Sequence, residues 1–424
     1  MEMEEIDSSS FIDDQSLLTD RPEGSSEGAA DLTNQFSFKQ IGSMAKYIEP
    51  ISGNYTLDEV MDMFNQQESL MAVPVEEYDR VIGVIDRKTV MAATSTAWKR
   101  FTAKNVGDYV QRSSAVLYAR DFIEKTLAKV SEINREDGVI YFPVFNNRSF
   151  YGIVSLDDFL SRIAEIREQD LAKAAIIQQG LLPTEEELAP LPFKVTCWNR
   201  MANALGGDFF KTFELDKDRY LLCCFDVSGK NVAASLLTIA VGSFFSAMKH
   251  MDALPKNPAK VIARLDAYLK DTVPVGSFIT AAICYVDYEH KQLYLFNMGH
   301  TTVYLLFEDG PKTRLASVNP QLPPLGMGAV KEALEAADKA PEKPFTAIPI
   351  KTNMHLEMYS DGFTDMQSDD GVRYDEERTK RFFVDLYTTS TADVQGRITH
   401  VVDNWIQNAM LPDDITVMDV RFGR

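Results

Sequence analysis

Residues 191–424 contain short apolar segments that come in neighbouring pairs and are separated by longer helical segments. Period-two alternation marks the strands, whereas apolar residues three and four positions apart mark the helices. The strands are expected at Phe193–Trp198, Asp208–Leu215, Arg219–Val227, Ile279–Asp287, Gln292–Met298, Thr302–Phe307, Phe345–Ile350, His355–Tyr359 and Asp414–Phe422. The helices are expected at Asn231–Lys249, Pro258–Thr272, Asp375–Tyr387 and Ala392–Ala409. Strand hairpins separated by helical pairs predict an antiparallel α+β sandwich rather than a parallel sheet.

Aspartates stand where these strands begin or end. The motifs are Gly206-Gly207-Asp208, Asp226-Val227-Ser228-Gly229, Ser360-Asp361-Gly362 and Asp413-Asp414-Ile415-Thr416. Each motif alone is first a turn signal, because Asp and Gly favour turns. If the carboxylates converge at one edge of the sheets without basic partners, they repel one another unless cations bind among them. Oxygen ligands favour Mg²⁺ or Mn²⁺, and the glycines would let the backbone approach such ions closely.

These motifs, with Asn297-Met298-Gly299-His300 between the second and the third, closely resemble those of the metal-dependent protein phosphatase (PPM) superfamily. Within it the resemblance is to the bacterial SpoIIE/RsbU-type branch, and it covers roughly residues 178–424. It implies an α-β-β-α sandwich with two Mn²⁺ or Mg²⁺ ions between the sheets. The activity that it implies is hydrolysis of phosphoserine or phosphothreonine on a protein.

The resemblance also implies a role for each aspartate. By position, Asp226 would bridge both ions and the backbone carbonyl of Val227 would complete one of them. Asp361 and Asp413 would bind the other ion, and Asp208 would bind directly or through water. Asp414 would support the ligands from outside the first coordination shell. A water shared by the two ions would then attack phosphorus in line, so no protein nucleophile is required.

The substrates implied by the resemblance are phosphorylated STAS-domain anti-sigma-factor antagonists, and hence a part in partner switching. The alternative hypothesis is a nucleotide-sensing scaffold whose phosphatase-like domain only binds partners. The intact set of four aspartates favours the enzyme.

Two positions depart from the family's pattern. Met298 replaces the usual Ala, and Asn231 stands where Gly is common, so both could alter loop geometry. His300 either orients a ligand or binds phosphate, or it has a structural role. Lys230 either helps to hold phosphate or is a solvated surface residue. The run Lys331–Lys343 is of mixed charge, which indicates an exposed insertion near the site.

Residues 41–160 contain two stretches of similar plan, in which a helix leads into two short strands. The first stretch has Thr56 as a helix N-cap. This tandem α/β arrangement resembles a pair of cystathionine-beta-synthase (CBS) modules, which implies a regulatory domain that binds an adenine nucleotide. Ser155 and Asp158 match the positions where that family binds a ribose. The alternative is that Ser155 caps a helix and Asp158 favours the N-terminal end of its dipole. Asp86 and Thr89 stand in reversed order in the first stretch.

Residues 1–40 are acidic, rich in Ser and Gly and without periodicity, which predicts a disordered tail. A linker helix is predicted within residues 161–190, because the sequence is strongly helix-forming up to Leu182 and Pro183 then stops the helix. Its apolar stripe is interrupted at Arg167 and Asp170. The helix could therefore form a homodimer seam or simply pack on one domain.

Composition limits the partners and the compartment. The formal net charge of −20 argues against nucleic acid or an anionic membrane as a partner, since both would be repelled. The acidic N-terminus is unlike a signal peptide, and the apolar stretch Leu236–Met248 is too short to span a bilayer. We therefore expect a cytoplasmic protein. The adjacent Cys223 and Cys224 are expected to be reduced and to leave one strand on opposite faces.

Overall fold

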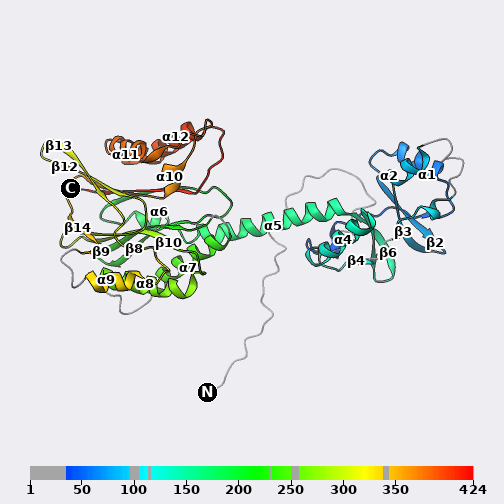
Figure 1. Cartoon of the computed structure of the whole chain (residues 1–424), viewed down its shortest axis with the longest axis horizontal. Coiled ribbons are helices and arrows are strands. Elements are labelled where there is room, and N and C mark those ends of the chain that lie inside the picture. The colour runs from blue at the N-terminus through cyan, green and yellow to red at the C-terminus, as the bar shows by residue number, and fades with distance from the viewer. Residues whose placement is uncertain are drawn as a thin grey trace, which may run out of the picture. The chain divides into compact units, whose positions relative to one another are not determined.

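The computed structural model describes residues 35–95, 105–112, 116–229, 232–249, 257–337 and 343–423 of the 424-residue chain. The described residues divide into two compact units, one up to residue 168 and one from residue 169 onward (Figure 1). Within the described residues, no helix combines the length and the apolar character that a membrane span requires.

The first unit consists of two halves with the same plan. Each half has a three-stranded sheet whose first two strands are parallel and whose last two are antiparallel, in the orders β1-β2-β3 and β4-β5-β6. The first half contains β1 (Ile51–Ser52), α1 (Leu57–Gln66), β2 (Ala72–Glu77), β3 (Arg80–Asp86) and α2 (Arg87–Thr94), and η3 (Val106–Asp108) packs with it through Val106. The second half contains β4 (Leu117–Tyr118), α4 (Ile123–Asp137), β5 (Tyr141–Asn146), β6 (Ser149–Ser155) and the beginning of α5 (Leu156–Gln179), and η2 (Ile41–Ser43) packs with it through Ile41. The two halves match the internal duplication expected from the sequence.

Local sequence signals account for much of this unit. Thr56 caps α1 in a reciprocal arrangement with Glu59, as the sequence predicted for the cap. The folded part begins earlier than predicted, because Phe36 packs with Ile41 in the core of the second half. Residues 35–40 of the predicted tail therefore belong to this unit, whereas residues 1–34 lie outside the described residues.

The second unit is built on two five-stranded antiparallel sheets, with strand orders β14-β11-β10-β9-β8 and β13-β12-β15-β16-β7. The first contains β8 (Asp208–Asp216), β9 (Arg219–Val227), β10 (Ile279–Asp287), β11 (Gln292–Met298) and β14 (Thr346–Pro349). The second contains β7 (Lys194–Arg200), β12 (Val303–Asp309), β13 (Lys312–Val318), β15 (Met354–Tyr359) and β16 (Ile415–Phe422).

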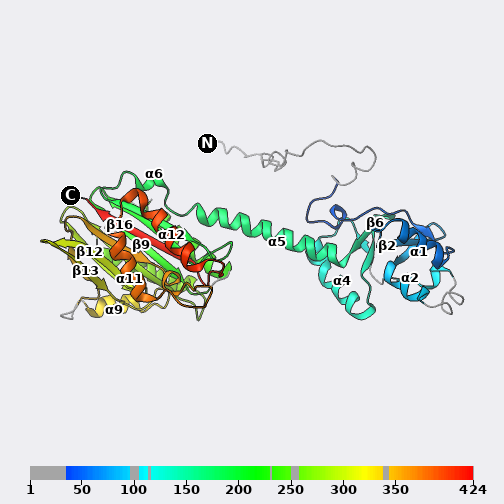
Figure 2. The same cartoon turned by 90° about the horizontal axis from the view of Figure 1, so that it is seen from above.

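Helices cover the outer face of each sheet. On one side lie α7 (Val232–Lys249), α8 (Pro258–Thr272) and α9 (Val330–Ala337), and on the other α10 (Asp361–Asp365), α11 (Asp375–Leu386), η4 (Thr391–Asp393) and α12 (Val394–Ile406). Figure 2 shows α11 and α12 lying across the sheet that contains β12 and β16. The short α6 (Glu185–Leu188) precedes β7. The predicted α-β-β-α sandwich is confirmed.

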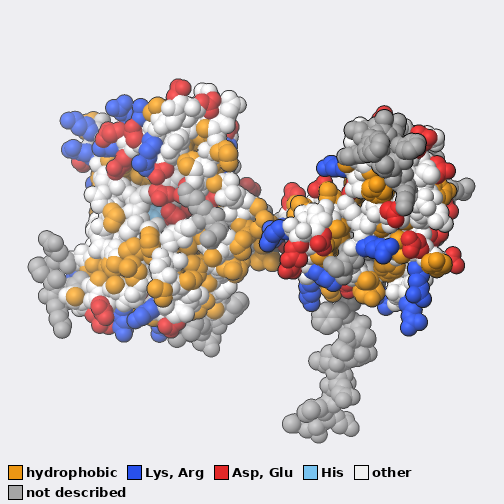
Figure 3. Space-filling view, turned by 45° about the vertical axis from the view of Figure 1, so that its right-hand side comes forward, with side chains coloured by type: hydrophobic (Ala, Val, Ile, Leu, Met, Phe, Trp, Pro, Cys, Tyr) orange, Lys and Arg blue, Asp and Glu red, His pale blue; other side chains and the backbone are white. Residues whose placement is uncertain are grey.

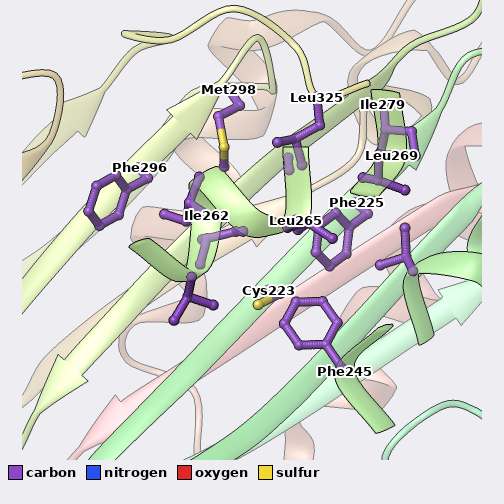
Figure 4. Close-up of a cluster of buried hydrophobic side chains, with 14 of the residues drawn as sticks. Cys223, Phe225, Phe245, Ile262, Leu265, Leu269, Ile279, Phe296, Met298 and Leu325 are labelled. Atoms are coloured by element: carbon purple, nitrogen blue, oxygen red, sulfur yellow. The ribbon is translucent and has the colours of Figure 1, made fainter. Parts of the chain in front are cut away.

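The alternation of side chains along β9 separates two cores. Cys223 and Phe225 face α7 and α8, where they pack with Phe245 and Leu265 (Figure 4). Cys224 points to the other face and joins the core between the two sheets. The prediction that adjacent cysteines leave the strand on opposite faces is confirmed, and neither forms a disulfide.

The run Lys331–Lys343 was predicted to be an exposed insertion; residues 338–342 lie outside the described residues, and the described first part is exposed on one face only. Its first part is α9, in which Val330 and Leu334 pack into the core beside α8. Asp266 of α8 accepts hydrogen bonds from the backbone amides of Gly326 and Val330 at 3.0 and 3.1 Å. The mixed charges occupy the outer face of a helix whose apolar residues are four apart, and this spacing was overlooked.

Candidate metal centre

Asp208 and Asp226 lie opposite each other on neighbouring strands. They are cross-strand partners at the ends of β8 and β9, so their side chains share one face of the sheet. The same face carries Phe210 and Cys224, which belong to the core between the two sheets. Asp208 is buried at 2% exposure, and Asp226 is half-buried. Sheet pairing alone therefore brings two of the predicted ligands together between the sheets.

Ser360 joins this pair to the second sheet. The residue follows β15, and its hydroxyl donates a hydrogen bond of 2.6 Å to Asp208 Oδ2. The Ser360 hydroxyl also accepts from the backbone amide of Thr416 at 2.9 Å, and its own amide donates to the carbonyl of Thr416. The next residue is Asp361, the exposed first residue of α10. The strand end that presents Asp361 is thus tied directly to Asp208.

Asp413 and Asp414 come to the same place from the beginning of β16. The two carboxylate oxygens of Asp414 accept hydrogen bonds from the amides of Ala202 and Gly207, at 2.7 and 2.6 Å. Asp413 Oδ1 accepts from the Asp414 amide at 2.9 Å. Asp414 therefore holds the loop that leads into Asp208.

Two glycines permit this close packing. A Cβ atom on Gly362 would lie 2.0 Å from the Asp414 carbonyl oxygen and 3.3 Å from the Asp413 Cβ. A Cβ on Gly207 would lie 2.8 Å from the carbonyl oxygen of Val227. Glycine is required at both positions because the backbones of distant segments touch there. Asp361 consequently lies next to the Asp413–Asp414 segment.

The electrostatics of the site are unfavourable without a cation. Burial raises the pKa of Asp208 well above its ordinary value, and the neighbouring carboxylates of Asp226 and Asp414 raise it further. Hydrogen bonds from Ser360 and Thr416 oppose that rise. Burial also raises the pKa of Asp414. An oxygen-only donor set with this excess of negative charge fits a hard divalent ion such as Mg²⁺ or Mn²⁺.

The predicted ligands do not surround a single point. Among the described residues, the group of three His, Cys, Asp or Glu side chains whose ligand atoms all lie within 4.8 Å of one another is His355, Glu357 and Asp419, not the four aspartates. A two-ion centre distributes its ligands over ions about 3.5–4 Å apart, so such a set need not converge on one position. The aspartates are gathered by backbone contacts and a shared serine.

Comparison with known proteins identifies the domain types. Residues 216–423 match the protein-family model described as Stage II sporulation protein E (SpoIIE), and residues 38–95 match the CBS domain. Residues 216–423 form a SpoIIE-family domain. Residues 38–95 form a CBS domain, and the second half of the first unit repeats its plan.

One curated relative and two solved structures illustrate the likeness. The chain is 23% identical over 165 residues to "Phosphoserine phosphatase RsbP" of Bacillus subtilis, which is 38% of this chain and 38% of that protein. The SiaA-PP2C domain of Pseudomonas aeruginosa has 18% identity and a TM-score of 0.51, covering 61% of this chain and 98% of that domain, so the two share a fold. The PP2C domain and regulatory-domain fragment of SpoIIE from Bacillus subtilis has 15% identity and a TM-score of 0.42, over 54% of this chain and 63% of that one.

Met298 and His300 of the SpoIIE domain lie on different sides of the site. Met298 is fully buried in the core beneath α8 (Figure 4). It lies on the face of the sheet opposite to the one that carries Asp208 and Asp226. His300 Nδ1 lies 3.0 Å from the hydroxyl of Thr280, which lies 3.3 Å from the carbonyl oxygen of Asp226. Burial lowers the pKa of His300 to about 4, so its imidazole is neutral at pH 7. Asn231 and Lys230 lie outside the described residues.

A pocket of about 490 Å³ lies beside the strand end that carries Asp361. Its lining includes His300, Tyr359, Arg373 and Glu376. Arg373 forms an ion pair with Asp365, which raises the pKa of Arg373, and the Asp361 carboxylate adds to that rise. Figure 3 shows acidic and basic side chains mixed on the surface over α11 and α12. Sequence reasoning missed Arg373, because a single arginine in a loop carries no motif. A larger pocket of about 540 Å³ is lined by Lys211–Asp216, away from these carboxylates.

We call the first unit the CBS unit, after the domain matched at residues 38–95. In its second half, Ser155 and Asp158 bind each other. Asp158 Oδ2 accepts from the Ser155 amide and hydroxyl at 2.8 and 2.7 Å, and Lys46 Nζ lies 3.2 Å from Asp158 Oδ1. Burial raises the pKa of Asp158, but these bonds lower it by more. In the first half Asp86 caps α2 through the amide of Thr89. Both aspartates thus take part in hydrogen bonding at helix N-termini.

Proposed function

We propose that this chain is a metal-dependent protein phosphatase that hydrolyses phosphoserine or phosphothreonine on a regulatory protein. The observation that carries the proposal is the hydrogen bond from Ser360 to Asp208, because it links the two sheets where their aspartates gather. Asp208, Asp226, Asp361 and Asp413, with the carbonyl of Val227, would hold two Mn²⁺ or Mg²⁺ ions. When bound, these ions would lower the pKa of a shared water and neutralise charge on the phosphoryl group.

The chain's own groups would position the substrate and the ligands. Asp414 holds the Gly206–Gly207 loop, so that Asp208 keeps its place on β8. The Thr280 hydroxyl hydrogen-bonds to both the His300 imidazole and the backbone carbonyl of Asp226. Because this imidazole is neutral, it adds no positive charge that would repel the ions. Arg373 lies in the neighbouring pocket and could bind an oxygen of the phosphoprotein.

Release of inorganic phosphate from a phosphoserine protein tests this proposal. We expect turnover with Mn²⁺ that is lost in Asp361→Asn and retained in Asp271→Asn, an exposed aspartate of α8. A phosphorylated STAS-domain protein is the proposed substrate class, since that is the class the family resemblance implies. Absence of phosphate release with every phosphoprotein, together with unimpaired partner binding, would favour the alternative of a scaffold.

The CBS unit is proposed to regulate the phosphatase through α5. Gln178, near the end of this helix, is buried, and its side-chain amide donates 2.7 Å hydrogen bonds to the Gly206 carbonyl and to Thr238 Oγ1. A shift of α5 would therefore move the loop that leads into Asp208. If Gln178→Ala leaves both turnover and its response to deletion of residues 1–155 unchanged, α5 does not transmit a signal.

Two further parts of the proposal concern ligands of the first unit and the oligomeric state. An adenine nucleotide would bind at Ser155 and Asp158, and AMP, ADP or ATP should then change the melting temperature, an effect that Asp158→Asn would remove.

Ile176 and Ile177 of α5 are 68% and 61% exposed, and they could form a homodimer seam. Light scattering of Ile176→Lys should then show a smaller particle than the unaltered chain does.

A further inference from the structure

A second group of polar side chains lies inside the SpoIIE domain, on the opposite face of the β15–β16 pair. Glu357 of β15 is directly opposite Asp419 of β16, and His355 is opposite Arg421. Residues two apart on a strand share a face, and Tyr359 on this face packs against the helical layer of α11 and α12. Neighbouring Leu356 and Met358 instead face the other sheet. The group is thus separated from the four aspartates by the sheet itself.

This group contains buried atoms that have no hydrogen-bond partner. Glu357 is completely buried, and neither of its carboxylate oxygens has a partner, nor does Nδ1 of His355. Such groups destabilise a fold unless something satisfies them. Arg421 does not, because its guanidinium is paired with Asp419 at 2.8–3.0 Å and donates to the carbonyls of Leu386 and Thr389. Arg421 is engaged by Asp419 and by these carbonyls, and it makes no hydrogen bond to Glu357.

The spacing of these groups favours a metal ion over a proton. One ligand atom from each of His355, Glu357 and Asp419 lies within 4.8 Å of the others. A proton on Glu357 would satisfy one oxygen and leave the other oxygen and the imidazole nitrogen without partners. An ion bound at about 2.0–2.2 Å from each ligand atom would give partners to both Glu357 and His355, with Asp419 as the third ligand. One imidazole with two carboxylates suits zinc better than magnesium, which prefers oxygen ligands alone.

We propose that His355, Glu357 and Asp419 bind one divalent transition-metal ion of the zinc class, as a structural site distinct from the proposed catalytic centre. Tyr387 closes the site from the end of α11, since its ring lies 4.5 Å from that of His355 and its hydroxyl donates to the Asn353 carbonyl at 2.9 Å. The ion fixes β15 to β16 four residues before Asp361. It thereby steadies the strand that presents Asp361.

Metal content of the full chain tests this site. The purified chain is stripped with a chelator, loaded with Zn²⁺, dialysed, and assayed by mass spectrometry. About one Zn²⁺ per chain should survive dialysis in Asp226→Asn, which disables the proposed catalytic centre, and adding Glu357→Gln or His355→Gln to that variant should remove it. Equal zinc content in the single and double variants would overturn the proposal.

A spectroscopic measurement covers the case in which the double variants do not fold. Zinc X-ray absorption of the Zn²⁺-loaded Asp226→Asn chain should show one imidazole among ligands at about 2.0–2.1 Å. Spectra with oxygen ligands alone would overturn the proposal, because His355 would then not be bound. Neither readout depends on phosphatase activity, so failure of the zinc site and failure of the proposed function are distinguishable.

Discussion

At two strand ends in this protein a serine precedes an aspartate by no more than three residues. The two serines differ in which residue their side chain forms a hydrogen bond with. Ser155 ends β6 and hydrogen-bonds to Asp158 only three residues further along. Ser360 follows β15 and donates to Asp208, 152 positions away in sequence and on another sheet. The first arrangement completes one helix end, whereas the second joins segments that meet only in the folded domain. In this protein, the serine whose hydrogen-bond partner lies far away in the sequence is the one that belongs to the candidate metal centre.

The largest effect is expected at the carboxylates that the second arrangement gathers. Asp226→Asn should lower phosphatase turnover by roughly 100-fold or more, because it removes the proposed bridge between the ions. Asp158→Asn should leave the metal-dependent turnover in the absence of nucleotide within a few-fold. Steady-state phosphate release with Mn²⁺ measures both. Comparable losses of turnover in Asp226→Asn and Asp158→Asn would contradict the assignment of catalysis to the aspartates between the two sheets.

A matched pair of glycines tests the close approach of the backbones. In Gly362→Ala the new Cβ would lie 2.0 Å from the Asp414 carbonyl oxygen, so Asp361 must move away from Asp413. Displacements of about 1 Å can cost about 100-fold in rate, and we expect a loss of ~10- to 100-fold. Gly396→Ala in α12 meets no atom within 4 Å and should raise stability by about 0.5–1 kcal/mol. Turnover and thermal unfolding of both variants provide the measurement, and an active Gly362→Ala chain would contradict the packing.

The two serines themselves should differ in what they affect. Ser360→Ala leaves buried Asp208 without that donor and should destabilise the SpoIIE domain by about 1–3 kcal/mol, with weaker Mn²⁺ binding. Ser155→Ala removes a helix-end hydrogen bond and should cost about 1 kcal/mol in the CBS unit alone. Denaturant unfolding and Mn²⁺ titration of each variant separate the cases. If both changes weaken Mn²⁺ binding equally, Ser360 contributes no more to the metal centre than Ser155 does, which would contradict the proposed site.

The smallest expected effect is in the pH dependence of the metal-free chain. The pKa of Asp208 is raised, so the folded state binds its proton more tightly than the unfolded state, and stability is gained as pH falls through the raised pKa toward 3.8. The pKa of Asp158 is lowered, so its contribution is present above 3.8 and is lost as pH falls through the lowered pKa. Melting temperatures of Asp208→Asn and Asp158→Asn should therefore depart from the unaltered curve in opposite senses. Parallel curves would contradict these assignments.

Much of the fold could be predicted because its signals are local. Thr56 capped its helix as expected, and the alternation at Cys223 and Cys224 marked the two faces of β9. The edge strand Lys312–Val318 was missed, since its exposed Lys312 and Arg314 hide the apolar alternation. Edge strands are commonly protected by such charges, so the pattern that prevents aggregation also obscures the strand.

The candidate site was only partly predictable. The aspartate motifs could be found in sequence because each is contiguous and lies at a strand end. The roles of Ser360 and Gln178 could not, because their partners are 152 and 28 residues away and neither contact has a sequence signature. Glu357 and Asp419 were likewise missed, since two acidic residues within apolar strands become a pair only through the β15–β16 register.

The most direct test of the central claim is a crystal structure of the full chain grown with Mn²⁺, with anomalous scattering recorded at the manganese edge. The account predicts two manganese peaks between the sheets, with Asp226 touching both and with Asp361 and Asp413 binding one of them. A structure in which Asp226 lies away from Asp361 and Asp413, with no manganese between them, would contradict it.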